Sequence, residues 1–183
     1  MWKIVFRAGK GTNQPPRGFV FHVMRNHAEM LDSQTVEGKK WIAREAEVVE
    51  RLKVLWGGDF IELGPASKVD RIMIDPIGRQ ARSAVEVRCR DESLSQLSRW
   101  GSIFMSAEKW TDMQVLCMTL NIPACFVVHV LQDDALIWAY LFDRAGVPRA
   151  RSRTVRRKTQ RSCNGGEKDA VVRQIEYRDF KRL

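Results

Sequence analysis

Histidine and cysteine are scarce in this sequence, and the few present are not spaced for metal binding. The 183 residues include three His and four Cys. The cysteines form no Cys-x-x-Cys pair, which argues against a zinc site and a disulfide framework, so we interpret them as reduced thiols. His22 and His27 lack zinc-helix spacing and His129 stands alone in an apolar run, so we expect structural roles for all three.

Long apolar runs and nucleotide-binding motifs are also missing. No run is long enough to span a bilayer, and residues 1–7 hold no apolar stretch of signal-peptide length. The glycine clusters at residues 9–12 and 57–58 match neither the P-loop nor the dinucleotide-binding fingerprint. We therefore expect a cytoplasmic protein without a membrane partner, and nucleotide hydrolysis has no support.

The net charge of +9 is concentrated in one part of the chain. Residues 144–183 contain 13 Lys and Arg and four Asp and Glu, whereas residues 1–143 contain 18 of each kind. A neutral body with a basic extension favours a polyanion such as DNA as partner, because phosphate contacts release counterions. The alternative is a basic surface that only aids solubility. The residues that we expect to contact DNA are Arg149, Arg151, Arg153, Arg156, Arg157, Lys158 and Arg161.

Hydrophobic periodicity predicts an α/β protein with one main core. We expect an N-terminal β-hairpin appendage (1–34), an α/β core (35–143) and a basic C-terminal extension (144–183). Helices are predicted over residues 36–56 and from an N-cap at Ser106 to Asn121. The predicted strands cover residues 60–63, 69–75, 83–88, 124–131 and 135–142, and a basic hairpin is predicted around residues 164–166.

A turn fixes the relation between two acidic residues. Gly78 lies in the turn between two predicted strands, and Asp70 and Glu86 are each eight residues from it. Residues equally far from the turn of an antiparallel hairpin face each other on one side of the sheet. Facing carboxylates destabilise a sheet unless a cation lies between them. The spacing therefore predicts a paired carboxylate site.

The same register sorts the neighbouring charges. Asp75 falls opposite a position near Ala81, so we interpret it as a turn residue and not as a ligand. Lys68 and Arg88 fall opposite each other on the face that carries the two acids, because side chains alternate along a strand. Paired carboxylates suit Mg²⁺ or Mn²⁺, and a nearby Lys or Arg stabilises the transition state of phosphodiester cleavage.

The first predicted helix adds a third acid. Glu45 falls at the centre of the apolar stripe of this helix, whereas Glu47 and Glu50 fall on its other side. A Glu that points inward needs a partner, because an unpaired buried charge is costly. We expect Glu45 to belong to the carboxylate site, and the alternative is a Glu satisfied by an internal Arg or by backbone groups.

Three pieces of the sequence carry a family resemblance: Glu45, Ser67-Lys68-Val69-Asp70, and the segment from Ala84 to Arg90. In their order of helix, three-strand meander, helix and strand, residues 36–142 resemble the PD-(D/E)XK, or restriction-endonuclease-like, nuclease superfamily. The likeness is greatest to small nucleases and Holliday junction resolvases of phages and bacteria. It implies a restriction-endonuclease-like α/β core, metal binding by Asp70, Glu86 and the Val87 carbonyl, and an outer or additional ligand role for Glu45.

One position departs from the family pattern. Arg88 stands where the family usually has Lys, and Arg binds phosphate well but cannot act as a base. Two lysines are candidate substitutes: Lys68, opposite Arg88, and Lys109, at the start of the second helix, where some related phage sequences also have Lys. We expect Lys109 to contact substrate phosphate, and the alternative is a solvated helix Lys.

The function that these features predict is metal-dependent endonucleolytic cleavage of DNA with Mg²⁺ or Mn²⁺. Branched DNA from recombination is the expected substrate, and a homodimer would place the two cuts that a resolvase makes. The alternative is a catalytically inactive, nuclease-fold DNA-binding protein, because Arg88 replaces the usual Lys. A third interpretation is a structural protein whose carboxylates form internal ion pairs only.

Overall fold

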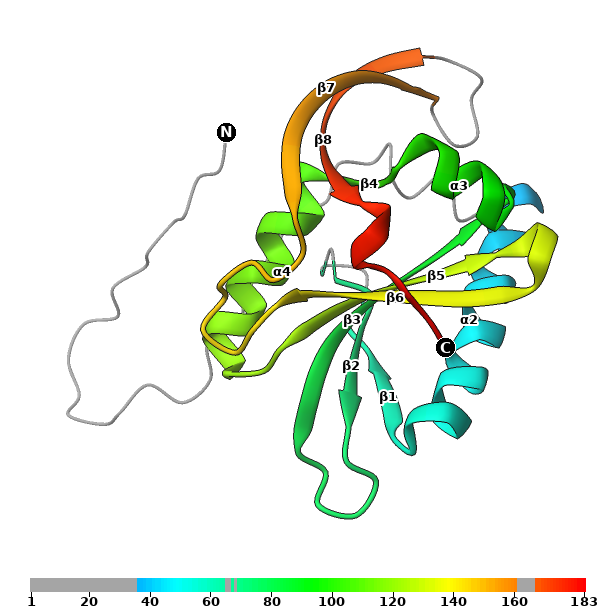
Figure 1. Cartoon of the computed structure of the whole chain (residues 1–183). Helices are drawn as coiled ribbons and strands as arrows, with labels where there is room; N and C mark the ends of the chain where they lie inside the picture. The colour runs from blue at the N-terminus through cyan, green and yellow to red at the C-terminus, as the bar shows by residue number, and fades with distance from the viewer. Residues whose placement is uncertain (1–35, 65–66, 68, 161–166) are drawn as a thin grey trace.

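The computed structural model describes residues 36–64, 67, 69–160 and 167–183, which form a mixed α/β protein (Figure 1). Its centre is a six-stranded mixed sheet in the order β1-β2-β3-β5-β6-β9. Strands β3 and β5 run parallel, and the other neighbouring pairs are antiparallel. The strands are β1 (Asp59–Glu62), β2 (Arg71–Ile74), β3 (Ala81–Arg90), β5 (Ala124–Val130), β6 (Ala135–Phe142) and β9 (Lys181–Arg182).

Helix α2 (Val36–Trp56) covers one face of this sheet, and it spans the residues predicted for the first helix. Val48 and Leu52 lie on its apolar stripe and are fully buried against Val85 and Val127 of the sheet. Burying each such side chain contributes about 2 kcal/mol of transfer free energy, so this contact holds the helix in place. The N-terminal half of α2 thereby passes close to the end of β3.

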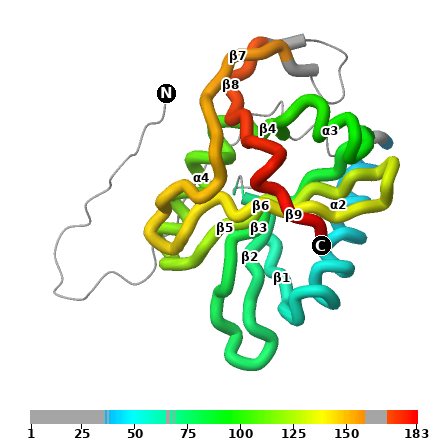
Figure 2. The backbone as a smooth tube through the Cα atoms, in the orientation of Figure 1, coloured from blue at the N-terminus to red at the C-terminus, as the bar shows by residue number. Residues whose placement is uncertain are grey.

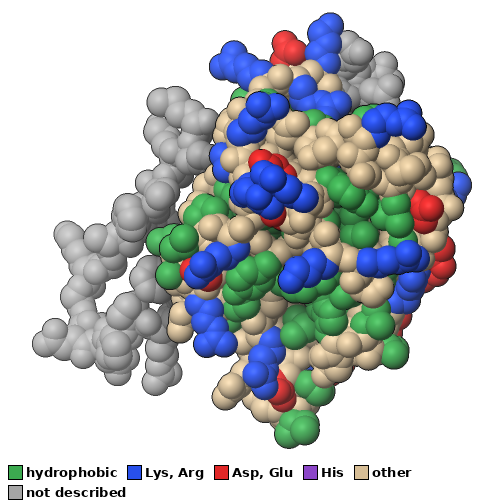
Figure 3. All heavy atoms as spheres, viewed as in Figure 1, with side chains coloured by type: hydrophobic (Ala, Val, Ile, Leu, Met, Phe, Trp, Pro, Cys, Tyr) green, Lys and Arg blue, Asp and Glu red, His purple; other side chains and the backbone are tan. Residues whose placement is uncertain are grey.

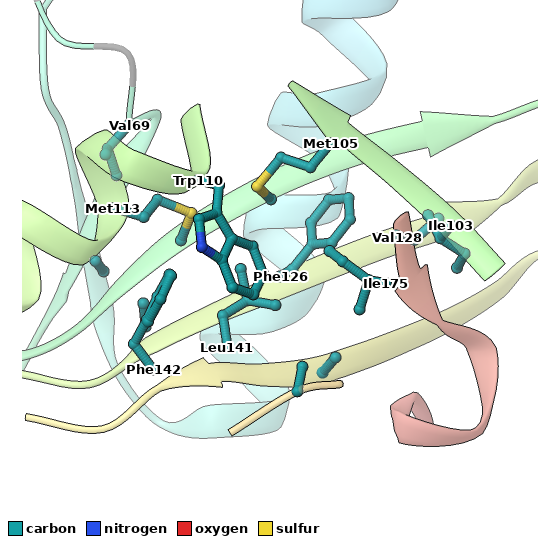
Figure 4. Close-up of a cluster of buried hydrophobic side chains, with 14 of the residues drawn as sticks. Val69, Ile103, Met105, Trp110, Met113, Phe126, Val128, Leu141, Phe142 and Ile175 are labelled. Atoms are coloured by element: carbon teal, nitrogen blue, oxygen red, sulfur yellow. The ribbon is translucent and has the colours of Figure 1, made fainter. Parts of the chain in front are cut away.

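The opposite face is covered by helix α4 (Ala107–Leu120) and by a second sheet in the order β4-β8-β7. The strands of this sheet are β4 (Ser102–Ser106), β7 (Ser152–Gln160) and β8 (Glu167–Glu176). Trp110 packs edge-on against Phe142 with ring centroids 4.5 Å apart, and Ile175 lies in the same cluster (Figure 4). This larger core fixes α4 over the central strands.

The hairpin of β2 and β3 has the register that the turn predicted. Arg71 faces Val85 and Ile72 faces Ala84, which places Asp70, one residue earlier, level with Glu86. Asp75 lies in the turn, where its Oδ1 accepts hydrogen bonds from the backbone N–H groups of Ile77 and Gly78 (2.9 and 2.8 Å). These bonds and the Arg82 side chain hold the pKa of Asp75 at about 2, so its interpretation as a turn residue is confirmed.

The second predicted helix is confirmed with both of its ends. The Oγ of Ser106 accepts a hydrogen bond from the backbone N–H of Lys109 (3.2 Å), and Asn121 ends α4 in the left-handed conformation with φ 52°. Trp110 is buried, whereas Trp100, which ends a short surface helix, is 54% exposed.

This short helix, α3 (Leu94–Trp100), and strand β4 were not predicted. Ser93 and Gln96 form a capping box at the start of α3, and Gly101 ends it with φ 67°. A Ser-x-x-Gln pair followed by a Gly five residues later is a start-and-stop signal for a helix. Both ends of α3 were therefore signalled in the sequence. The helix has only seven residues, which is too short for a clear hydrophobic periodicity.

The basic extension contributes strands to both sheets. Strands β7 and β8 pair in antiparallel orientation, as the predicted basic hairpin requires, and Val155 faces Val172. Strand β8 pairs in turn with β4. The end of the chain, β9, lies beside β6 in the central sheet (Figure 2). The described part of residues 144–183 is therefore packed on the α/β core.

Several predictions fall on residues that the structure does not describe. They are the N-terminal hairpin of residues 1–34, the side chain of Lys68, and Arg161 in the connection between β7 and β8. Among the helices that are described, none is long and apolar enough to cross a membrane.

The interpretation of the cysteines as reduced thiols is confirmed for the described residues Cys89, Cys117 and Cys125. Cys117 and Cys125 are buried free thiols, and burial raises their pKa values to about 12 and about 11. A protonated, buried thiol is a poor nucleophile, so these groups serve packing. His129 is also buried, and its Nε2 contacts Asp134 Oδ1 at 2.8 Å.

Candidate active site

The site lies where β3 extends beyond its neighbour β2. Pairing with β2 stops at Val85, whereas pairing with β5 continues to Arg90. Among the described residues, the segment from Glu86 to Arg90 therefore has a strand neighbour on one side only. On this open edge the backbone N–H of Val87 donates to the side chain of Asp70 instead of to a neighbouring strand.

Glu86 and Asp70 lie together at this edge, as the register predicted. Glu86 is fully buried, and its Oε1 contacts the same ammonium group, Lys109 Nζ, that lies 2.9 Å from Asp70 Oδ1. Asp70 Oδ2 is 3.4 Å from the backbone nitrogen of Val87, which donates to it. The two carboxyls are thus held against the same stretch of β3, one from its own strand and one from the residue that precedes β2.

Lys109 joins the two acids. Its Nζ is 2.9 Å from Asp70 Oδ1 and also contacts Glu86 Oε1, so one ammonium bridges both carboxylates. Lys109 occupies the first turn of α4, and the Ser106 cap and the packing of Trp110 fix that turn beside β3. We predicted that Lys109 contacts phosphate, and the structure places it on the carboxylates themselves.

Arg88 and Glu45 complete the group from two further directions. Arg88 Nε is 3.0 Å from Glu86 Oε1, and Arg88 Nη1 is 3.8 Å from Glu45 Oε1. Glu45 belongs to α2, and its side chain is 19% exposed, so it points inward as the helical periodicity predicted. Two cations and three carboxylates from four segments of the chain therefore converge on one point.

Burial controls the protonation of Glu86. It raises the pKa of this carboxyl to about 7, against the favourable charges of Arg88 and Lys109. The charge of the neighbouring Asp70 contributes to the rise, because it opposes the ionisation of Glu86. Two acids held close together do not ionise independently.

The other two acids respond differently to burial. Desolvation acts to raise the pKa of Asp70, but Lys109 and Arg88 outweigh it and bring the pKa below its ordinary value. Desolvation raises the pKa of Glu45, with Arg88 acting in the opposite direction. Perturbed acids with opposite shifts at one point are a feature of functional sites.

A pH series follows from the raised pKa of Glu86. Its folded-state value of about 7 exceeds its ordinary value of 4.5, so the folded protein binds this proton more tightly than the unfolded chain. The resulting stability is full below pH 4.5 and is lost as the pH rises through 7, by up to about 3 kcal/mol. Urea unfolding of metal-free protein between pH 5 and 8 should show this loss, and Glu86→Gln should reduce it. An equal pH dependence in the two proteins would contradict the shift.

The donor atoms present fit a divalent cation. Glu86 Oε2 is buried and accepts no hydrogen bond, and a single ammonium group contacts both carboxyls, so one cation can reach oxygens of both acids. Ala84 donates its N–H to Pro123 on the β5 side, so the backbone of Val87, three residues later, faces the open edge. Within the described residues no ready cluster of three His, Cys, Asp or Glu ligands is present, so water and substrate oxygens would complete the coordination.

Several basic residues that we predicted to bind DNA have partners within the protein. Arg149 Nη2 is 2.8 Å from Asp143 Oδ2, and Arg151 Nε is 3.1 Å from Asp179 Oδ1. Arg153 Nε donates to Gln174 at 2.8 Å. Ion-paired arginines at a surface carry less net charge toward a ligand, so Arg149 and Arg151 are weak candidates for DNA contact.

A pocket of about 990 Å³ lies apart from the carboxylates, between the end of α3 and the second sheet. Its lining includes Ser98, Ser102 and Arg153, together with Arg151 and Arg178. The last two are paired with acids of the same region, since both contact Glu176 Oε2. We assign the chemistry to the carboxylate site, because its acids have shifted pKa values, whereas Glu176, the acid that lines the pocket, is paired with Arg151 and Arg178.

The sequence missed one residue near this site. Arg90 follows Arg88 on the same face of β3, and its Nη2 donates to the carbonyl oxygen of Phe104 at 3.0 Å. Alternation along β3 was enough to place it beyond Glu86 and Arg88.

Comparisons of the chain with protein-family models, with curated proteins and with solved structures gave no match.

Proposed function

We propose that this protein is a metal-dependent deoxyribonuclease with a restriction-endonuclease-like core, in which Asp70 and Glu86 hold the metal ion. The observation that carries the proposal is the convergence of Asp70, Glu86 and Lys109 at the open edge of β3. A buried acid pair with a lysine across it is costly for a fold. Such a cost is expected where the site serves chemistry.

Asp70, Glu86 and the backbone carbonyl of Val87 would be the protein ligands. A bound Mg²⁺ or Mn²⁺ supplies an activated water and neutralises charge on the phosphodiester. Asp70 is the stronger ligand near neutral pH, since its pKa is below the ordinary value. Glu86 must lose its proton to bind, so metal affinity should increase as the pH rises through 7.

The two cations divide the role of the single lysine that the family usually has. Lys109 carries a compact ammonium on a flexible stem and reaches both ligands, so it is positioned to stabilise negative charge on a phosphate held between them. Arg88 contacts Glu86 with its Nε and is oriented by Glu45. We infer that Arg88 orients Glu86 and contacts phosphate, while Lys109 replaces the missing lysine.

A second candidate function is DNA binding without cleavage. It rests on Arg88, which cannot act as a base, and on the charge balance of the site, where Lys109 and Arg88 already neutralise the acids. In this case the basic strand β7 would hold DNA and the carboxylates would form internal ion pairs. The two functions differ in turnover and not in binding.

A cleavage assay separates them. Purified protein is incubated with labelled branched, duplex and single-stranded DNA in Mg²⁺, in Mn²⁺ and in EDTA. The proposal predicts products with either metal and none in EDTA. Salt-sensitive binding of DNA without products under any metal condition would favour the second candidate.

A further inference from the structure

A chain of arginines leads from the carboxylate site to strand β7. Phe104 of β4 is the junction: Arg90 donates to its carbonyl oxygen at 3.0 Å, and the guanidinium of Arg157 lies over its ring, 4.1 Å from the ring centroid. Arg90 belongs to the end of β3, and Arg157 belongs to β7. Two strands that are far apart in the sequence therefore bring their guanidinium groups to one residue.

The chain begins in the active site itself. Glu86, Arg88 and Arg90 occupy alternate positions of β3, so their side chains leave the same face at intervals of about 7 Å. Burial lowers the pKa of Arg90 and Glu92 acts against it, while the positive charges of Arg88 and of Arg157 both act to lower it further. Neighbouring guanidinium groups repel each other, and a bound anion relieves that repulsion.

The second sheet gives Arg157 a defined direction. Phe104, Gln174 and Arg153 face one another across the three strands, so they lie on one face of the sheet, and Arg157 lies four residues beyond Arg153 on the same face. The adjacent residue Arg156 points to the other face. The two arginines therefore have equal charge and nearly equal place in the sequence but opposite orientation.

Beyond Phe104, the two-stranded ribbon of β7 and β8 extends away from the rest of the protein. Strand β4 pairs with residues 172–176 of β8, whereas the pairing of β7 with β8 continues to Gln160 and Glu167. Figure 1 shows the two strands curving above the rest of the chain, and Figure 3 shows Lys and Arg side chains at the top of the view, where they lie. The arginine chain thus ends on a basic ribbon of a width that fits a DNA groove.

We propose that Arg88, Arg90 and Arg157 form a track for consecutive phosphates of one DNA strand, running from the cleavage site to the β7–β8 ribbon. The inference rests on the proposed function, and it adds a requirement for the substrate. The DNA must continue for several nucleotides past the scissile phosphate on the side of the ribbon. Arg157 contributes through the face that carries Phe104, so Arg156 is not part of the track.

The test compares two variants of the full chain, Arg157→Gln and its matched control Arg156→Gln. Binding of a fluorescently labelled DNA duplex is measured by anisotropy in EDTA at several salt concentrations, which removes cleavage from the measurement. Arg157→Gln should weaken binding about 5- to 20-fold and reduce the slope of log K against log salt by about 1. Arg156→Gln should weaken binding less than about threefold.

Two further variants address the middle of the track. Arg90→Gln should weaken binding to a similar extent as Arg157→Gln, while Arg90→Lys, which keeps the charge, should recover most of the affinity. Thermal unfolding of each variant shows whether it is folded.

Equal losses in Arg156→Gln and Arg157→Gln would overturn the track and leave the nuclease proposal intact. The stated difference between them, in a protein that cuts no DNA with Mg²⁺ or Mn²⁺, would support the track and overturn the nuclease proposal. A wild-type protein that binds no DNA at low salt would overturn both.

Discussion

Glu86→Gln should reduce metal-dependent DNA cleavage at least 1,000-fold, a loss of about 4 kcal/mol of transition-state stabilisation. Glu86 is fully buried beside Asp70, so glutamine fits the same space but cannot supply a negatively charged ligand oxygen. The variant should fold, because Gln resembles the protonated form that burial favours. Single-turnover cleavage of labelled DNA at saturating Mg²⁺ measures the effect.

Glu47→Gln is the matched control for this prediction. Glu47 lies on the exposed face of α2 and undergoes the same chemical change outside the site. It should cut DNA at the wild-type rate. Comparable cleavage by the Glu86→Gln and wild-type proteins would show that Glu86 is not a metal ligand.

Lys109→Met should lower the cleavage rate by about 100- to 1,000-fold, the second-largest effect that we expect. Methionine keeps the length of the side chain and removes the ammonium that contacts Asp70 and Glu86. Because we propose that Lys109 takes the role of the lysine expected at residue 88, Arg88→Lys should have a much smaller effect. Rates are compared at saturating DNA, since the loss concerns turnover and not binding.

Lys53→Met is the control for this substitution. Lys53 lies in the last turn of α2, and its Nζ is 2.7 Å from Glu50 Oε1. DNA affinity of Lys109→Met in EDTA should remain within about threefold of wild type. A Lys109→Met protein that cuts DNA at the normal rate would remove Lys109 from the chemistry and return the role to Arg88.

The register of one hairpin made the acid pair predictable from the sequence. The turn at Gly78 and the alternation of β2 and β3 determine which residues face each other, and the observed pairs Arg71 with Val85 and Ile72 with Ala84 continue to Asp70 and Glu86. Local signals were sufficient here because a hairpin is a local structure. The helix α2 and the inward position of Glu45 were predictable for the same reason.

The bridge from Lys109 to the acids was beyond sequence reasoning. It depends on how α4 lies over β3, which packing of Trp110 and Phe142 between distant segments decides. The arginine chain through Phe104 is also non-local, since it joins β3, β4 and β7. Charge counting correctly marked the C-terminal segment as basic, but it did not separate Arg157 from Arg149 and Arg151, which are paired with Asp143 and Asp179.

The position of Glu86 implies a compromise between stability and function. A charged carboxylate in a central strand opposes folding, and Lys109 and Arg88 offset only part of that cost, as the raised pKa shows. The same burial keeps an unbonded oxygen at the open edge of β3. Ionised Glu86 destabilises the metal-free protein and would be a ligand in the metal-bound protein. We therefore expect bound metal to increase the free energy of unfolding.

Calorimetric titration with Mn²⁺ tests the carboxylate pair most directly, because it requires neither a DNA substrate nor turnover. At pH 8, where Glu86 is largely ionised, the wild-type protein should bind Mn²⁺ at a site that Asp70→Asn and Glu86→Gln each abolish, while Glu47→Gln retains it. Unchanged Mn²⁺ binding in both site variants would contradict the assignment of Asp70 and Glu86 as the metal centre.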